Sequence, residues 1–145
     1  MTVTIRYAQP EDQQRCSELL GVLAEHTGGP FESFDSEAFE YLLTNERGCL
    51  IVAEEDGNIL GLASISFNFA LRYNGEYCTL EELVLDQDAR GKNVGGRLVE
   101  ETIRLAKERG CKEYGLYILE STLQNQTFYE KFGFAKVGID MRQKL

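Results

Sequence analysis

The sequence predicts an α+β protein, an α/β sandwich around one mixed sheet, with the element order β-α-α-β-β-β-α-β-α-β. Three observations predict this class. Strand-like and helix-like stretches share the chain, three consecutive strands are separated only by short turns, and a strand–helix–strand unit follows them. The crossover helix makes its two neighbouring strands parallel. The 145 residues hold no linker-like or repeated segment, which predicts a single domain over residues 1–145.

The first 45 residues predict one strand and two helices. Residues 3–8 (VTIRYA) alternate like a strand. Residues 10–12 (PED) form the acidic first turn of a helix whose apolar positions recur at helical spacing up to Leu23. Residues 26–35 (HTGGPFESFD) are rich in turn formers and predict a loop. Ser36 can then cap a short helix that runs through Leu43.

The middle of the chain predicts a meander of three antiparallel strands. Residues 49–55 (CLIVAEE) form an apolar run that is too short for a helix. Asp56-Gly57-Asn58 supplies a hairpin turn into a long strand-like stretch, and Asn74-Gly75 supplies a second turn before residues 76–86 (EYCTLEELVLD).

The last third predicts the strand–helix–strand unit and two further elements. Residues 94–109 keep apolar side chains at helical spacing, and Gly110 closes that helix. Residues 112–121 (KEYGLYILES) have the apolar character of a buried strand. A short helix over 122–133 and a final strand over 134–140 (FAKVGID) complete the prediction.

The charge distribution disfavours nucleic acid as a partner. The net charge is −9, and residues 1–60 hold 12 Asp and Glu against 3 Lys and Arg, whereas the remainder holds 12 of each sign. Nucleic-acid binding needs clustered cations, while an acidic surface attracts a cationic partner. The alternative is that the acidity only keeps the protein soluble.

Cysteine usage and hydropathy predict a cytoplasmic protein without a metal site. The four cysteines are widely spaced, with no CxxC and a single histidine, so we expect reduced thiols and no metal. No stretch approaches the length of a membrane span, and the N-terminal residues do not form a signal peptide. We therefore expect no membrane partner.

The most informative stretch is LEELVLDQDARGKNVGGRLVEE, residues 80–101. Its glycines stand where a loop opens into a helix, so unpaired amides and the helix dipole favour a phosphate there. Arg90, Lys92 and Arg97 add positive charge. Neither the P-loop nor the dinucleotide fingerprint matches this glycine spacing, and a plain tight turn is the alternative.

This stretch resembles the acyl-CoA signature of the GNAT superfamily of N-acetyltransferases. The family core, Arg/Gln-x-x-Gly-x-Gly/Ala, aligns with residues 90–95 (RGKNVG), with Asn93 in place of a glycine. Asparagine tolerates a left-handed conformation well, so we expect the loop to be retained. The ending FYEKFGF resembles the closing motif of the family, and within the superfamily the Leu-Glu-Glu stretch resembles the polyamine-acetylating branch.

The resemblance implies that acetyl-CoA is the acyl donor. The main chain of Leu83, Val84 and Leu85 would pair with the pantetheine arm, and Thr122 and Asn125 would line its other side. Thr122 stands where the family usually has asparagine. The loop that would hold the pyrophosphate comprises Arg90, Gly91, Lys92, Asn93, Val94, Gly95 and Gly96.

The resemblance also implies two catalytic residues. Tyr129 matches the family tyrosine, whose phenol can protonate the departing thiolate, although an aromatic that only packs is the alternative. Glu81 is the expected base that deprotonates the amine, with Glu82 contacting the substrate. Neighbouring residues on a regular strand face opposite ways, so we expect only one of the two carboxylates in the cleft, and which one is the base stays open.

The acceptor is expected to be a small cationic amine. The loop with Phe31 and Glu32, together with Phe67, Phe69 and Tyr73, suggests apolar walls for methylenes and carboxylates for ammonium groups. Two alternatives stay open, an N-acetyltransferase of proteins or peptides and a non-catalytic CoA-binding sensor. The resemblance also makes a homodimer possible.

Overall fold

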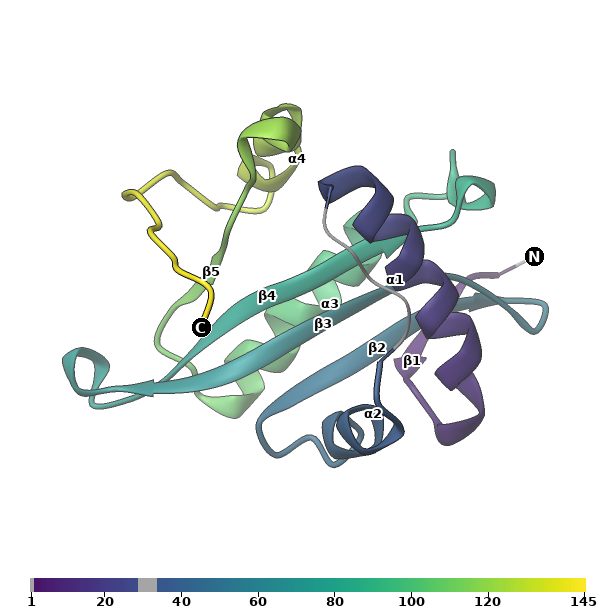
Figure 1. The fold of residues 1–145 in the computed structure, drawn as a ribbon, viewed down its shortest axis with the longest axis horizontal. Coiled ribbons are helices and arrows are strands. Elements are labelled where there is room, and N and C mark those ends of the chain that lie inside the picture. Colours follow the sequence, from purple (N-terminus) through teal and green to yellow (C-terminus); the bar gives the residue numbers. More distant parts are fainter. Residues whose placement is uncertain (1, 29–33) are drawn as a thin grey trace.

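The computed structural model describes residues 2–28 and 34–145 and contains one five-stranded sheet in the order β1-β2-β3-β4-β5 (Figure 1). The first four strands pair antiparallel, and β4 and β5 pair parallel. The predicted α+β class with a mixed sheet is confirmed. The strands are β1 (Thr4–Tyr7), β2 (Gly48–Glu55), β3 (Asn58–Ala70), β4 (Gly75–Leu85) and β5 (Tyr114–Leu116).

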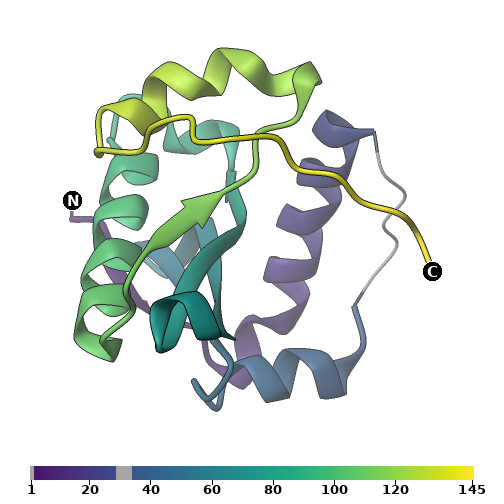
Figure 2. The ribbon, with the colours of Figure 1, turned by 90° about the vertical axis from the view of Figure 1, so that its left-hand side faces the viewer.

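Helices cover both faces of the sheet, with α1 on one side and α3 on the other (Figure 2). Each face carries its own apolar core, because inward positions alternate along the strands. The helices are α1 (Gln13–Thr27), α2 (Ser36–Leu42), α3 (Val94–Arg109) and α4 (Gln126–Glu130). Short 3-10 turns are η1 (Pro10–Asp12), η2 (Leu71–Tyr73), η3 (Gln87–Ala89) and η4 (Glu120–Asn125).

The predicted turns and the α3 boundaries are confirmed. Asp56 and Gly57 have φ of 52° and 81°, as a tight hairpin turn requires, and Gly110 closes α3 with φ of 89°. The cap of α2 differs from the prediction by one residue. Asp35, not Ser36, is the N-cap, and its carboxylate accepts the amide of Glu37 at 2.9 Å.

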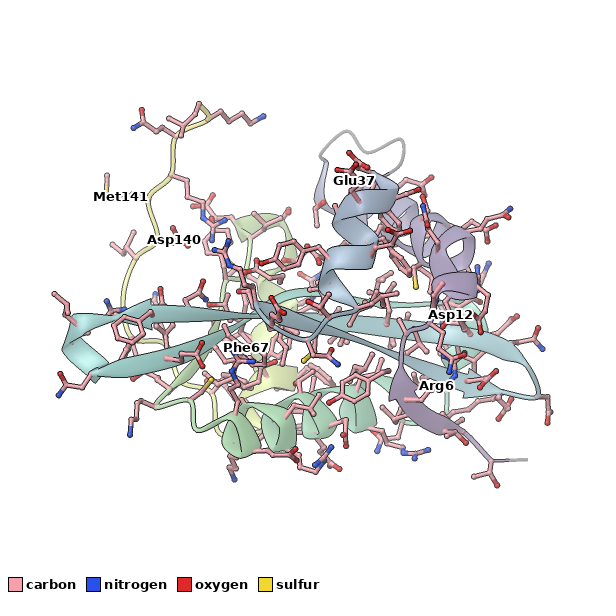
Figure 3. All side chains as sticks on the ribbon, turned by 90° about the horizontal axis from the view of Figure 1, so that it is seen from below. Arg6, Asp12, Glu37, Phe67, Asp140 and Met141 are labelled. Atoms are coloured by element: carbon pink, nitrogen blue, oxygen red, sulfur yellow. The ribbon has the colours of Figure 1, made fainter. Side chains whose placement is uncertain are left out.

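A charged contact fastens β1 to the turn before α1 (Figure 3). Arg6 donates to the Asp12 carboxylate at 2.8 Å and to Glu54 of β2 at 2.9 Å. Burial alone would raise the pKa of Asp12, but the hydrogen bonds from Arg6 and from the Gln9 amide hold it below its ordinary value. This contact orients the start of α1 over the sheet.

Two predictions for C-terminal strands are wrong, the first in its length and the second in the strand itself. The strand expected over 112–121 is shortened to β5, because the chain leaves β4 after three paired residues. The strand expected over 134–140 has no strand partner in the described chain, and its backbone runs on without regular structure. Its apolar side chains stay in solvent, with Val137 94% and Ile139 91% exposed.

Candidate active site

The candidate site begins where β4 and β5 separate (Figure 1). Their parallel pairing ends at Leu80 and Leu116, whereas β4 continues to Leu85 with β3 as its paired neighbour. One backbone edge of residues 81–85 is therefore left without a strand partner in the sheet. A free edge can pair with an extended chain. The residues predicted to bind pantetheine, Leu83, Val84 and Leu85, lie on this edge.

The start of α3 presents backbone amides that no helical acceptor satisfies. The first helical hydrogen bond runs from Arg97 N to Asn93 O at 3.1 Å. The amides of Val94, Gly95 and Gly96 precede it, and these three residues are buried. Buried unpaired amides at a helix N-terminus suit an anion. Gly91 and Asn93 bend the loop with φ of 75° and 55°, so Asn93 adopts the left-handed conformation expected of it.

The glycines at 95 and 96 have steric reasons to be glycines. A Cβ on Gly96 would collide with the Asn93 side-chain oxygen, so the asparagine carboxamide already fills that space. A Cβ on Gly95 would lie 3.2 Å from Leu85 Cδ1 and 3.5 Å from Phe128 Cζ. The helix start can therefore lie close to both the end of β4 and α4. The unpaired amides of the loop suit the diphosphate of coenzyme A, whereas the two glycines are required by packing within the protein.

The three cations of the loop are not equivalent, which corrects the sequence interpretation. Arg97 donates to the Val3 carbonyl at 2.6 Å and so points toward β1. Lys92 pairs with Glu55 of the β2–β3 hairpin at 2.6 Å. Arg90 is exposed and has no ion pair within the described chain, so it remains available to a phosphate.

A β-bulge at Glu81 places both carboxylates on the same face of the sheet, and the expectation that they face opposite ways is wrong. The register passes from Ser64↔Glu82 to Ile65↔Leu80, so Glu81 has no opposing residue on β3. Glu81 accepts from Ser66 Oγ at 2.6 Å, and Glu82 accepts from Ser64 Oγ. The two serines alternate along β3 and share one face, which is the face that α1 covers.

The two carboxylates differ in burial. Glu81 is exposed and Glu82 is half-buried. Desolvation raises the pKa of Glu82, the charge of Glu81 adds to the rise, and the Ser64 hydrogen bond opposes it. A carboxylate with a raised pKa accepts a proton more readily near neutral pH. The pair thus combines an exposed anion with a better proton acceptor.

Tyr129 lies on α4 among other aromatic rings. Its ring centroid is 5.1 Å from that of Phe128 and 6.1 Å from that of Phe134. Desolvation raises the pKa of Tyr129 above its ordinary value, so the phenol stays protonated at neutral pH. No hydrogen bond occupies its Oη among residues 2–28 and 34–145. Tyr129 can therefore serve as a donor as well as a packing residue.

The residues predicted opposite the β4 edge lie on η4. Thr122 is half-buried and donates its hydroxyl to the Leu119 carbonyl at 3.2 Å, so this hydrogen is already used. Asn125 is exposed at the N-cap of α4 and makes no side-chain cap bond. Of the two, Asn125 has the free amide.

The acceptor wall differs from the sequence interpretation. Phe31 and Glu32 lie outside the described residues. Phe67 belongs to the core on the α3 face, opposite Glu81, and Arg109 lies 4.2 Å above its ring (Figure 3). It therefore does not line the acceptor face.

Sequence reasoning missed Ser64 and Ser66, which position the two carboxylates, and also Arg142. The guanidinium of Arg142 lies 4.9 Å from the Tyr117 ring centroid and pairs with Asp140 at 2.9 Å. The Asp140 hydrogen bond raises the pKa of Arg142, and the charge of Glu81 contributes. Arg142 is thus a cation over the Tyr117 ring, within electrostatic range of Glu81. For Ser64 and Ser66, a signal was available in the sequence. The two serines are two residues apart on a predicted strand, and the neighbouring predicted strand carries the Glu81-Glu82 pair.

Two other kinds of site are not found in the described chain. Residues 2–28 and 34–145 contain no group of three His, Cys, Asp or Glu side chains placed to hold a metal ion. In the same residues no helix combines the length and apolar character of a membrane span.

Comparisons with known proteins show the family and the fold. The profile of the Acetyltransferase (GNAT) family matches residues 14–134. Glucosamine 6-phosphate N-acetyltransferase of Arabidopsis thaliana is 31% identical over 97% of this chain and 95% of its own. A crystal structure of that Arabidopsis enzyme superposes with a TM-score of 0.83 at 27% identity, covering 99% of both chains. A crystal structure from Bacillus halodurans C-125, described as a transcriptional regulator, superposes with a TM-score of 0.87 at 29% identity. The match covers 99% of this chain and 100% of that chain.

Proposed function

Because this chain belongs to the acetyltransferase (GNAT) family, whose members use acetyl-CoA as acyl donor, we propose that it acetylates the primary amine of a small, positively charged molecule. The observation that carries the proposal is the pair of adjacent carboxylates, Glu81 and Glu82, on the face beside the free β4 edge. Two anions on one open face attract an ammonium group and supply a base for its proton.

The two carboxylates divide the work. The family resemblance favoured Glu81 as base, but the burial of Glu82 supports the opposite assignment. Exposed Glu81 holds the ammonium group, and Glu82, whose pKa burial raises, takes the proton before the amine attacks. Ser64 and Ser66 hold the two carboxylates in place.

The other residues hold the donor and stabilise the leaving group. The amides of Val94, Gly95 and Gly96 bind the diphosphate, Arg90 adds charge, and the edge formed by Leu83, Val84 and Leu85 aligns the pantetheine arm. The thioester supplies the acetyl group when acetyl-CoA is bound. Tyr129 donates a hydrogen bond to the sulfur as it gains charge. The amine attacks directly in a ternary complex, without an acyl-enzyme.

Thiol release from acetyl-CoA tests the proposal across a panel of polyamines, lysine analogues, aminoglycosides, amino sugars and peptides. We expect turnover with small cationic amines and none with neutral or anionic acceptors. Glu82→Gln should lower kcat by roughly 10²-fold, whereas Glu81→Gln should mainly raise the KM for the amine. Turnover of peptides alone would favour a protein N-acetyltransferase. CoA binding with no turnover of any amine would favour a sensor.

A second acceptor, an amino-sugar phosphate, has support from Arg142. The Arabidopsis relative is named for glucosamine 6-phosphate, and the guanidinium of Arg142, which lies over the Tyr117 ring, is within electrostatic range of Glu81. In this alternative Glu81 and Glu82 receive the amine and Arg142 the phosphate. Arg142→Gln would then raise the KM for glucosamine 6-phosphate at least tenfold and leave the KM for glucosamine unchanged. Equal effects on both sugars would reject the alternative.

A further inference from the structure

A row of polar side chains continues along β3 beyond the two serines of the site. Ser64, Ser66 and Asn68 occupy alternate positions and so share one face of the strand, whereas Ile65 and Phe67 belong to the core on the α3 face. Asparagine is depleted in strands, because its short polar side chain offers the backbone competing hydrogen bonds. The reason for an asparagine at position 68 therefore lies in its contacts.

The carboxamide of Asn68 bridges β3 and β4. Its Nδ2 donates to Ser66 Oγ at 3.2 Å and to Thr79 Oγ1 of β4 at 3.3 Å. The nitrogen of a carboxamide carries two hydrogens, and these two bonds use both. All three residues are half-buried, which limits competition from water for these bonds. The Asn68 side chain is thus fixed between two strands.

Glu81 determines the direction of these hydrogen bonds. A carboxylate only accepts, so Ser66 donates its single hydroxyl hydrogen to Glu81, at 2.6 Å. Ser66 Oγ can then only accept from Asn68, which turns the nitrogen of the carboxamide, not its oxygen, toward the serine. Asn68, Thr79, Ser66 and Glu81 form one directed network, called here the Asn68 network, that ends at the exposed carboxylate.

Glu81 needs such a network because the β-bulge leaves it without a cross-strand neighbour. No residue of β3 opposes it, and its side chain is exposed. Within residues 2–28 and 34–145, Ser66 is the one hydrogen-bond donor to its carboxylate. An exposed glutamate otherwise keeps much of its rotamer freedom. A hydroxyl that can itself rotate limits that freedom only if its own direction is fixed, and the bond from Asn68 fixes it.

We propose that Asn68 is a positioning residue for Glu81: anchored on Thr79, it holds the Ser66 hydroxyl toward the Glu81 carboxylate and keeps that carboxylate aimed at the incoming ammonium group. This inference rests on the proposed function, in which Glu81 holds the ammonium group. Asn68 acts through Ser66 and does not contact the amine. Its loss therefore weakens amine binding and spares the proton transfer assigned to Glu82.

Steady-state kinetics at saturating acetyl-CoA, with spermidine as acceptor, test the proposal. Asn68→Ala should raise the KM for spermidine about 3- to 10-fold and leave kcat within about twofold. Thr79→Val, which removes the anchor and keeps the shape, should raise the KM by a smaller factor, and Thr79→Ser, which retains the hydroxyl, should not raise it. The matched control is Asn58→Ala, an exposed asparagine at the other end of β3, which should change neither constant.

A double-mutant cycle with Ser66→Ala separates positioning from direct contact with the amine. Without the Ser66 hydroxyl there is nothing for Asn68 to direct, so Asn68→Ala added to Ser66→Ala should change the KM by about 1.5-fold at most. Three results would overturn the proposal: an equal rise in KM in both backgrounds, an unchanged KM in Asn68→Ala, or a lower kcat in Asn68→Ala without a higher KM.

Carbon-13 NMR of the Glu81 carboxylate gives a readout that needs no acetyl transfer. In the labelled protein without ligand, Asn68→Ala should shift this resonance in the same direction as Ser66→Ala does, and the double variant should shift it no further than Ser66→Ala alone. Asn58→Ala should leave it in place. If these shifts appear but spermidine is not acetylated, the proposed function fails and the positioning of Glu81 by Asn68 is upheld. If spermidine is acetylated but the resonance ignores Asn68→Ala, the positioning role alone is wrong.

Discussion

At the scale of single residues, the site depends on a few side chains whose surroundings set their chemistry. Glu81 and Glu82 have the same functional group, but one is exposed and the other is half-buried beside Ser64. Burial raises the pKa of Glu82 and of Tyr129 in the same sense, because desolvation disfavours the charged form of each. Tyr129 therefore keeps its proton near neutral pH, and Glu82 accepts a proton more readily there than an exposed glutamate does.

Glu82→Gln should make the protein more stable at pH 8. The pKa of Glu82 is raised in the folded state, so its contribution to stability is full below the ordinary glutamate pKa and is lost as pH rises through the raised value. Glutamine removes the half-buried charge and can still accept a hydrogen bond from Ser64. We expect Tm to rise by roughly 2–5 °C at pH 8 and by nothing near pH 3.5, measured by calorimetry. Exposed Glu81, changed to Gln, is the control, and a lower Tm for Glu82→Gln at pH 8 would contradict the account.

Tyr129→Phe should lower kcat by about 10- to 100-fold. The ring packing against Phe128 and Phe134 remains, and only the phenol donor is lost. Stopped-flow thiol release measures kcat, and calorimetric titration with CoA measures the affinity for CoA. We expect that affinity to stay within twofold of the unmodified protein. An unchanged kcat from pH 6 to 9 would leave Tyr129 as a packing residue.

At the scale of elements, two departures from regular geometry shape the site. The bulge in β4 turns Glu81 onto the face of Glu82, and the early end of β4–β5 pairing opens the edge beside Leu83. Regular pairing along the whole of β4 would separate the carboxylates and close the edge. The start of α3 completes the site because its first amides are buried and unpaired by the helix.

Gly96→Ala should weaken acetyl-CoA binding, and Asn93→Gly should restore it. The new methyl group would collide with the Asn93 carboxamide and displace the loop. Glycine at 93 removes that carboxamide and accepts the φ of 55° without strain. We expect the KM for acetyl-CoA to rise about tenfold in Gly96→Ala and to return within twofold in the double variant, which is a test of coupling. Additive effects of the two changes would show that the collision is not the cause.

At the scale of the whole molecule, two cores on opposite faces of the sheet hold the site elements together. Cys16 lies in the core beneath α1, and Cys49 and Cys78 lie in the core beneath α3. All four cysteines are free thiols, as predicted, and Cys111 alone is partly exposed. Burial raises the pKa of Cys16 and of Cys78 to about 12, so neither is a thiolate at neutral pH.

Thiol labelling should therefore report unfolding of the entire structure. With Ellman's reagent at pH 7.5, we expect Cys111 to react within minutes and the other three thiols to react only as the protein unfolds. Their rates in increasing guanidinium should converge on one value if both cores open together. A cysteine of one core that reacts far faster than those of the other would show that the two faces unfold separately.

The sequence by itself determined the features that are encoded within a few neighbouring residues. The hairpin turn at Asp56-Gly57, the left-handed Asn93, and the limits of α3 follow from local backbone preference and from apolar spacing. The glycines before α3 likewise indicated an anion site, because helix geometry alone leaves those amides unpaired.

Only the tertiary structure decided how distant segments meet. The register of β4 against β3 places both Glu81 and Glu82 on one face of the sheet. The partners of Lys92 and Arg97 come from β2 and from the residue before β1, and Arg142, near the far end of the chain, lies over the Tyr117 ring. A strand pattern predicts which residues can pair but not whether they do, and the stretch over 134–140 has the pattern without a strand partner in the described chain.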